Sequence, residues 1–372
     1  MTLMAVIWYN VRKGQSEATS KAKLSRSCLQ ESQRELSVSL YQWKGKAAMP
    51  KMQFSTIPGL SKKVSRIFLG TGGDSFTKGK NMDALLDDVY ALGVNAFDTA
   101  RVYGLSEKVL GTWIAERGLQ KEVVVLSKGG HPSLMGKKRI KEAEIRKDVE
   151  KSRENLQMDC IDIYLLHRDD PQVEAGVIVE ILNALHAEGK ICAFGVSNWA
   201  HHRIEAANEY AYKNGLIPFA VSSPNFGLAE QVCDLWGGGC VTISGPGQKD
   251  AREWYQKNQM PIIAYSSLGR GLFSGRVKSD DPKSISAGMD RISIKGYGSS
   301  DNFERLRHCE QLAGKKGCSV AQIAMAWIYQ QQLNVFAVVS CSSAERMREN
   351  VDALHISLTQ QELDYLDLRA EI

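Results

Sequence analysis

The 372-residue chain lacks several features that would place it in a specialised class of protein. No apolar run approaches the roughly 20 residues that a membrane-spanning helix needs. The basic residues near the N-terminus follow the short apolar stretch 1–10 instead of preceding it, which is the wrong order for a secretory signal. The net charge of +5 is modest, and the Lys and Arg residues are scattered. We therefore expect no membrane partner and no nucleic-acid partner.

Closely spaced cysteine pairs are also lacking. The eight cysteines are dispersed and none forms a C-x-x-C pair, so no zinc or other metal site is expected. Cys160, Cys192 and Cys341 lie inside or beside apolar runs, where a reduced cysteine packs as a small hydrophobic side chain. The pattern favours reduced cysteines and a cytoplasmic location.

The composition of the chain changes near residue 51. Residues 1–51 are rich in Ser, Lys, Gln and Glu and have no sustained hydrophobic period, so we interpret them as a poorly ordered or irregular N-terminal extension. A vector-derived leader, or the remnant of a second catalytic domain, would show the same composition. Residues 52–372 form the expected folded domain, because short apolar runs alternate there with amphipathic segments.

The folded domain is predicted to be an α/β protein with a closed barrel. Most of its apolar runs are spaced roughly 25 to 45 residues apart with amphipathic helices between them, which indicates βα units and a parallel sheet. The last gap is longer and requires an insertion. Eight such runs favour a (β/α)8 TIM barrel. The expected strands are Ser65–Leu69, Val94–Asp98, Val123–Lys128, Ile161–His167, Ile191–Ser197, Phe219–Ser223, Ile262–Ser266 and Val335–Ser340.

An open, doubly wound sheet is the alternative fold. It would require G-x-G-x-x-G between the first strand and a helix. The stretch Gly70-Thr71-Gly72-Gly73 has the wrong spacing, and Gly237-Gly238-Gly239 lies far along the chain. The closed barrel is therefore preferred.

Chemically active residue types end successive strands of this barrel, where the active site of the fold is built. Asp98, Lys128 and His167 end the second, third and fourth runs, and Tyr103 follows Asp98 in the next loop. Each residue alone is more often structural. Together they form a proton donor, because a Lys ammonium roughly 4 Å away favours the phenolate by at most about 4 kcal/mol. Asp98 would keep Lys128 protonated, and His167 would orient a carbonyl group.

These residues lie in motifs that resemble the aldo-keto reductases. The motifs are Asp98-Thr-Ala-Arg-Val-Tyr103-Gly-Leu-Ser-Glu107, Leu126-Ser-Lys128, Leu165-Leu-His167 and Gly195-Val-Ser-Asn198, and the resemblance covers roughly residues 52–360. It implies a barrel with an N-terminal hairpin over Met52–Ser65 and C-terminal helices. It also implies reversible hydride transfer between NADP(H) and a small-molecule aldehyde or ketone, with Tyr103 as the general acid. NAD(H) is the alternative cofactor.

The resemblance also implies a set of cofactor contacts. Its members are Ser197, Asn198 and Tyr265 for the nicotinamide, Ser266, Leu268 and Arg270 in a glycine-rich loop for the pyrophosphate, and Ser342, Arg346, Glu349 and Asn350 for the adenosine end. Arg346 matches the contact to the 2′-phosphate. Two positions depart from the family pattern: Ser223 replaces a common Gln, which Asn225 or a water could substitute, and Ser340 stands where some NADPH-selective members have Lys.

Substrate selectivity is expected in loops around the barrel mouth. These are His131–Lys138, Trp199–His202, Phe226–Gly239 and Met289–Gly298, of which Trp199 and Phe226 would give the pocket an aromatic character. Phe226 equally fits plain core packing. The alternative function is a redox-sensing or regulatory subunit that binds nicotinamide cofactor and turns over slowly. The sequence does not set the physiological substrate or the oligomeric state.

Overall fold

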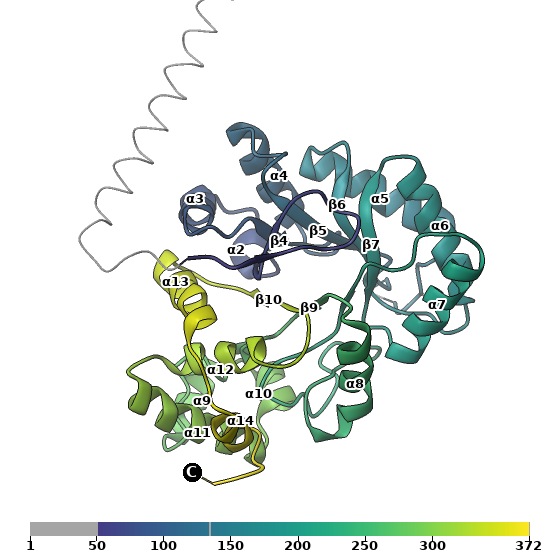
Figure 1. Ribbon diagram of the computed structural model, residues 1–372. Coiled ribbons are helices and arrows are strands. Elements are labelled where there is room, and N and C mark those ends of the chain that lie inside the picture. The colour runs from purple at the N-terminus through teal and green to yellow at the C-terminus, as the bar shows by residue number, and fades with distance from the viewer. Residues whose placement is uncertain (1–50, 134, 372) are drawn as a thin grey trace, which may run out of the picture. The chain divides into compact units, whose positions relative to one another are not determined.

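The predicted barrel is present in the computed structural model, which describes residues 51–133 and 135–371 (Figure 1). The predicted extension 1–51 lies outside the described residues, apart from Lys51. All neighbouring barrel strands pair in parallel, and pairing between β10 and β3 closes the barrel. The strands are β3 (Ile67–Gly70), β4 (Ala96–Asp98), β5 (Val124–Gly129), β6 (Ile161–Leu166), β7 (Ile191–Ser197), β8 (Val221–Ser223), β9 (Ile262–Ala264) and β10 (Val335–Val339).

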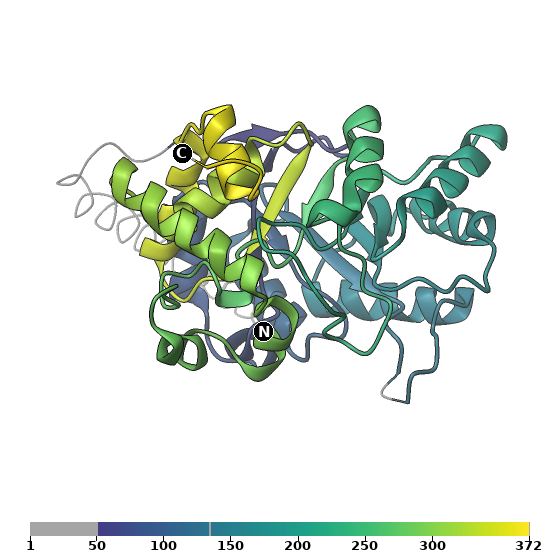
Figure 2. The same ribbon diagram turned by 90° about the horizontal axis from the view of Figure 1, so that it is seen from below.

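Helices surround the barrel on its outside (Figure 2). They are α2 (Asp74–Thr77), α3 (Asp83–Ala91), α4 (Ser106–Arg117), α5 (Glu142–Leu156), α6 (Ala175–Ala187), α7 (His201–Lys213), α8 (Lys249–Asn258) and α12 (Val320–Tyr329), followed by α13 (Ala344–Asp352) and α14 (Gln360–Leu366) near the C-terminus. The insertion expected before the last strand consists of α9 (Pro282–Gly288), α10 (Arg291–Tyr297) and α11 (Ser300–Lys316), and it precedes α12.

Helix α6 shows why these segments are helical. Ile178, Ile181, Leu182 and Leu185 recur at spacings of three and four residues, and all four are buried against the sheet side of the helix. Val177 in the same helix is 46% exposed and lies outside this apolar stripe.

A small antiparallel hairpin, β1 (Phe54–Ser55) and β2 (Val64–Ser65), closes the N-terminal end of the barrel. Ile57 in its loop is 1% exposed and packs with the side chains that fill the barrel interior. Lys62 Nζ lies 2.6 Å from Asp162 Oδ1 and also donates to the carbonyl of Val123. This arrangement agrees with the hairpin that the family resemblance implied.

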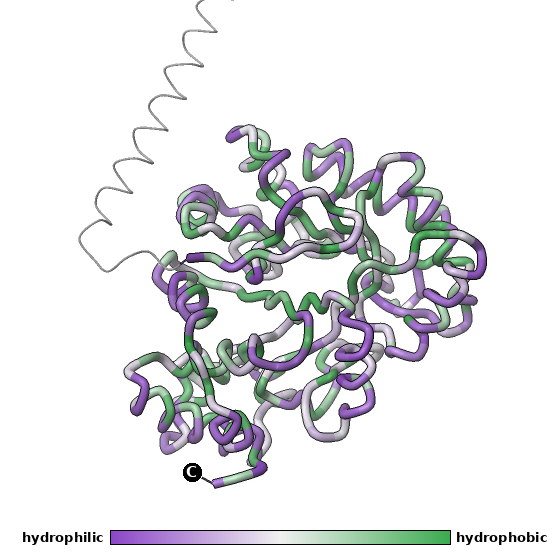
Figure 3. The backbone as a smooth tube through the Cα atoms, viewed as in Figure 1, coloured by the Kyte–Doolittle hydropathy of each residue, from purple (hydrophilic) through white to green (hydrophobic). Residues whose placement is uncertain are grey.

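The hydrophobic core has two parts because each strand presents one face inward and the other toward the helices. The inner part is a compact cluster that includes Phe68, Leu126, Ile163 and Phe336. The outer part joins the strands to the surrounding helices. Figure 3 shows hydrophobic residues along the central strands and hydrophilic residues gathered on the outer helices.

Two of the cysteines do not match the sequence prediction. Cys160 and Cys192 lie next to each other at the N-terminal ends of β6 and β7, with Cα atoms 6.4 Å apart, and are joined as a disulfide. The pairing of Ile161 with Ile191 across these strands brings them together, and the sequence alone did not reveal that register. Cys341 is a free thiol, as expected. Of the helices in the described ranges, none is long and apolar enough to span a membrane.

Candidate active site

A cavity of about 590 Å³ lies at the C-terminal ends of the barrel strands. Residues at or just beyond the ends of β3, β4, β5, β6, β7, β9 and β10 line it. The four predicted catalytic residues, Asp98, Tyr103, Lys128 and His167, all belong to this lining. The fold therefore brings together side chains that are up to 69 positions apart in the chain, as counted from Asp98 to His167.

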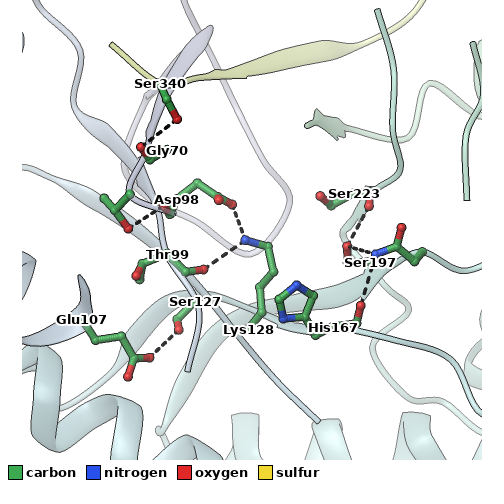
Figure 4. Close-up of polar contacts among 12 residues, drawn as sticks. Gly70, Asp98, Thr99, Glu107, Ser127, Lys128, His167, Ser197, Ser223 and Ser340 are labelled. Carbon is green, nitrogen blue, oxygen red and sulfur yellow. Dashed lines mark hydrogen bonds and ion pairs between the residues drawn. The ribbon is translucent and has the colours of Figure 1, made fainter. Parts of the chain in front are cut away.

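Lys128 and Asp98 form a buried ion pair at the floor of the cavity (Figure 4). Lys128 Nζ lies 2.6 Å from Asp98 Oδ1 and 3.0 Å from the carbonyl oxygen of Thr99, to which it also donates. Burial raises the pKa of Asp98, and the adjacent Lys128 ammonium opposes that shift. Because the two groups compensate each other's charge, a cation can be kept at the base of the cavity.

Tyr103 lies in the loop after β4, above this ion pair. Its ring centroid is 5.5 Å from Lys128 Nζ and 5.8 Å from the ring centroid of His167, which it meets edge to face. Burial raises the pKa of Tyr103, while Lys128 lowers it. The direction of the ammonium's effect agrees with the sequence argument, but burial outweighs it, so the phenol keeps its proton at neutral pH.

His167 follows β6 directly and is held by its backbone. Its amide donates to the carbonyl oxygen of Gly129 at 2.8 Å, and its own carbonyl accepts from Asn198 Nδ2 at 3.2 Å. Burial, followed by the charges of Lys128 and Arg168, moves the pKa of His167 well below its usual value of 6.5. The imidazole is therefore neutral at neutral pH, and its buried Nδ1 has no partner among the described residues.

A buried glutamate behind the cavity fixes the strand that carries Lys128. Glu107 in α4 is 1% exposed, and its two carboxylate oxygens accept from Ser127 Oγ at 2.7 Å and Asn155 Nδ2 at 2.9 Å. Ser127 and Lys128 are adjacent on β5 and point to opposite faces of the strand. Glu107 therefore anchors the outer face of β5 while Lys128 enters the cavity.

The predicted nicotinamide contacts form one hydrogen-bonded group on the opposite wall. Asn198 Nδ2 donates to Ser197 Oγ at 3.0 Å, and Asn198 Oδ1 accepts from the Tyr265 hydroxyl at 2.7 Å. Ser197 Oγ in turn donates to the carbonyl oxygen of Ser223 at 2.8 Å. Asn225, which could substitute for the family's Gln, lies outside the cavity lining; it donates to the Tyr297 hydroxyl and to the carbonyl oxygen of Tyr265, and accepts from Thr242.

The predicted phosphate contacts are only partly gathered at the cavity. Ser266, Leu268, Arg270 and Arg346 line it, and Arg270 is held by Ser293 Oγ at 2.9 Å and Asp290 Oδ2 at 3.3 Å. Ser340 also lines the cavity and donates to the carbonyl oxygen of Gly70. The predicted contacts outside the lining are Ser223, Ser342, Glu349 and Asn350.

Comparison with known proteins agrees with this geometry. A sequence model described as the aldo/keto reductase family matches residues 66–370. The chain belongs to the aldo/keto reductase family. It is similar to the aryl-alcohol dehydrogenase GME11368 of Pestalotiopsis microspora, with 27% identity over 83% of this chain and 80% of that protein. It is also similar to the norsolorinic acid reductase of Aspergillus flavus (27% identity, 76% and 70%) and to the uncharacterized oxidoreductase YrpG of Bacillus subtilis (25% identity, 85% and 95%).

The two predicted pocket aromatics of this aldo/keto reductase lie in the core instead. Trp199 is 1% exposed and packs against Phe219 at a centroid distance of 5.7 Å. Phe226 is fully buried against Trp327, at 5.6 Å. Neither belongs to the cavity lining, so the prediction that they line the pocket is wrong. For Phe226, the alternative of plain packing is the one that agrees with the structure.

Trp236 is the cavity aromatic that the sequence argument did not single out. It is 40% exposed, meets Tyr265 edge to face at 5.9 Å, and lies with its ring 5.2 Å from the Arg270 guanidinium. The sequence signal for Trp236 is the run Gly237-Gly238-Gly239 that follows it in the predicted loop Phe226–Gly239. In the structure these glycines have positive φ values of 80°, 106° and 79°. Such a glycine run turns the chain back sharply and exposes the residue before it.

Two further cavity residues of this aldo/keto reductase were not predicted individually. His131 lies 4.9 Å from the His167 ring, and Arg168 follows His167 in the chain. His131, Trp236 and Asp290 come from three of the four predicted pocket loops. The fourth loop, Trp199–His202, contributes no lining residue.

The cavity residues fit a nicotinamide dinucleotide. Arg270, Arg276 and Arg346 provide guanidinium groups, which bind phosphate oxygens well. Arg346 lies in the first turn of α13, whose N-terminus is capped by Ser343 and favours anions. His167 Nδ1, in the lining, is a buried polar atom with no partner among the described residues. These features suit a ligand that carries both phosphates and amide groups.

Proposed function

We propose that this aldo/keto reductase is an NADP(H)-dependent oxidoreductase that reversibly reduces aldehydes or ketones, with Tyr103 as the general acid. The observation that carries the proposal is that the Tyr103 phenol and the His167 imidazole lie in one cavity with the buried Lys128–Asp98 pair. The names of its relatives, which include a dehydrogenase and a reductase, support the same class of reaction.

Each residue has a distinct part in the proposed reduction. The Tyr103 hydroxyl donates its proton to the carbonyl oxygen of the substrate, and Lys128 stabilises the phenolate that remains. Asp98 keeps Lys128 charged. The neutral His167 offers an imidazole nitrogen that holds the carbonyl oxygen in place. When bound, the nicotinamide would supply the hydride to the carbonyl carbon, so the product is an alcohol. Tyr103 then regains a proton from solvent.

The proposed preference for NADP(H) over NAD(H) depends on Arg346. This side chain is exposed, lines the cavity and lies at the start of α13, where a 2′-phosphate would be attracted. Ser340 lies at the same end of the cavity and adds a hydroxyl group in place of a second cation. We therefore propose NADP(H) as the preferred cofactor and NAD(H) as a weaker one.

The test is turnover of 4-nitrobenzaldehyde with NADPH and, in parallel, NADH, followed by loss of absorbance at the nicotinamide band. Tyr103→Phe should lower kcat by roughly 10² to 10⁴, which is the usual contribution of a positioned general acid. Tyr212→Phe is the matched control, because Tyr212 is 69% exposed on α7 and outside the cavity lining. Equal loss in both variants, or none in Tyr103→Phe, contradicts the role of Tyr103. Tight NADPH binding without reduction of any carbonyl in a broad panel contradicts the proposed reaction.

A further inference from the structure

Arg168 is a buried cation in the cavity lining that the proposed reaction does not use. It directly follows His167 after β6, is 6% exposed and lines the cavity. Its Nη1 donates to the carbonyl oxygen of His167 at 2.9 Å. The same carbonyl oxygen accepts from Asn198, so the guanidinium is held between the catalytic histidine and the predicted nicotinamide contacts.

Arg168 has no acidic partner within 4 Å in the part of the chain that the structure describes. The next residue, Asp169, pairs instead with Arg203, whose Nε lies 2.7 Å from Asp169 Oδ2. Asp98, the carboxylate of the cavity floor, pairs with Lys128. The positive charge of Arg168 is therefore uncompensated by the protein.

An uncompensated charge in such a position is costly, because burial removes water that would otherwise solvate the ion. The charge of Arg168 acts on the cavity itself: it contributes to the pKa values of Tyr103, His131, His167 and Tyr265, all of which line the cavity. A guanidinium carries several N–H donors in a planar fork, and the structure uses one of its nitrogens. The remaining donors are suited to a carboxylate, which a guanidinium binds in a bidentate manner.

The other charged side chains near the reacting groups are already engaged or uncharged. Arg270 contacts Asp290 and Ser293 and is assigned above to the phosphates of the cofactor. Burial lowers the pKa of His131, so this imidazole is neutral at neutral pH. Arg168 is thus the cation that can receive an anionic group beside His167.

We propose that Arg168 binds the carboxylate of the substrate, and that the preferred substrates are aldehydes or ketones that carry a carboxylate. This inference rests on the proposed function, since it names the substrate class of the same site. The carboxylate would replace the missing partner of Arg168 and orient the carbonyl toward Tyr103 and His167. The effect is expected mainly in KM, because the contact is made on binding and changes little during the reaction.

The experiment compares 4-formylbenzoate with its methyl ester, which has the same ring and carbonyl but no charge. Wild type should show kcat/KM at least about tenfold higher for the acid, and Arg168→Gln should reduce that ratio at least about tenfold. Glutamine retains a donor for the carbonyl oxygen of His167. Arg307→Gln is the control for loss of a positive charge, because Arg307 lies on α11, outside the cavity lining, and should leave the ratio unchanged. Arg168→Lys keeps the charge and should retain part of the preference for the acid over the ester. It takes the place of Arg168→Gln in the comparison if the glutamine variant does not fold.

The outcomes separate this inference from the proposed function. If wild type reduces both compounds equally, or if Arg168→Gln leaves the ratio unchanged, the inference is overturned and the reductase assignment stands. If wild type reduces neither these two compounds nor any carbonyl of the broad panel with NADPH or NADH, the proposed function fails. In that case, calorimetric titration with benzoate tests whether Arg168 binds a carboxylate. Binding to wild type that is lost in Arg168→Gln supports the inference, and absence of binding to wild type overturns it.

Discussion

Replacement of Lys128 by methionine gives a sharp test of the electrostatics at the cavity floor. The change removes the ammonium group and keeps an unbranched side chain of similar length. Asp98 would then be buried without its partner, because Lys128 Nζ is the hydrogen-bond donor that its side chain contacts. At 2.6 Å and an effective dielectric constant near 20, the lost attraction is about 6 kcal/mol.

Protonation of Asp98 limits the cost of this substitution. Holding a carboxyl group with an ordinary pKa near 3.9 in its neutral form at pH 7 costs about 4 kcal/mol. This is less than the lost attraction, so Asp98 should become protonated in the folded variant. The folded state then binds a proton that the unfolded state releases, and the stability of the variant falls as pH rises. The destabilisation relative to wild type should be about 4 kcal/mol at pH 7 and about 1.5 kcal/mol at pH 5.

Urea unfolding of wild type, Lys128→Met and the double variant Asp98→Asn/Lys128→Met at both pH values measures this difference. The double variant has no ionisable group at either position, so its destabilisation relative to wild type should not change with pH. A Lys128→Met cost that is the same at pH 5 and pH 7 would refute the reasoning. It would mean that Asp98 finds another partner or is solvated when Lys128 is absent.

Two further predictions concern the barrel wall and His167. Gly195→Ala should destabilise the fold by several kcal/mol, because a Cβ atom there would overlap the carbonyl oxygen of Val221 on the neighbouring strand. Gly314→Ala in α11 meets no atom within 4 Å and should change stability by less than about 1 kcal/mol, so similar urea midpoints for the two variants would contradict the packing argument. Because burial keeps the pKa of His167 well below 6.5, the profile of kcat/KM between pH 6 and 8 should show no inflection from this residue. An inflection near pH 6.5 that disappears in His167→Gln would show that His167 does titrate there.

The strands and the central residues of the site were predictable because their signals are local. A barrel strand is a short apolar run, and its C-terminal end marks the mouth of the barrel. The positions of Asp98, Lys128 and His167 at successive strand ends therefore implied that they lie together, and in the structure all three line one cavity. The insertion before β10 was visible as an excess of chain between two strands.

The loops were less predictable because the sequence does not show which way a side chain points. Trp199 and Phe226 are aromatic residues just past strand ends, yet both turn into the core, whereas Trp236 reaches the cavity. The pairing of Cys160 with Cys192 depends on the register between two strands. The net rise in the pKa of Tyr103 depends on how deeply the phenol is buried, which only the structure shows.

The hairpin at the opposite end of the barrel has a consequence for how this enzyme could diversify. Lys62 and Ile57 pack at that end, whereas the loops that carry Trp236 and Arg270 line the cavity at the other end. We therefore expect the loops at the cavity to govern the entry and release of ligands, while the hairpin and the packed interior hold the fold together. Changes in these loops can alter which molecules react, and how long they stay, with little effect on the forces that hold the barrel together.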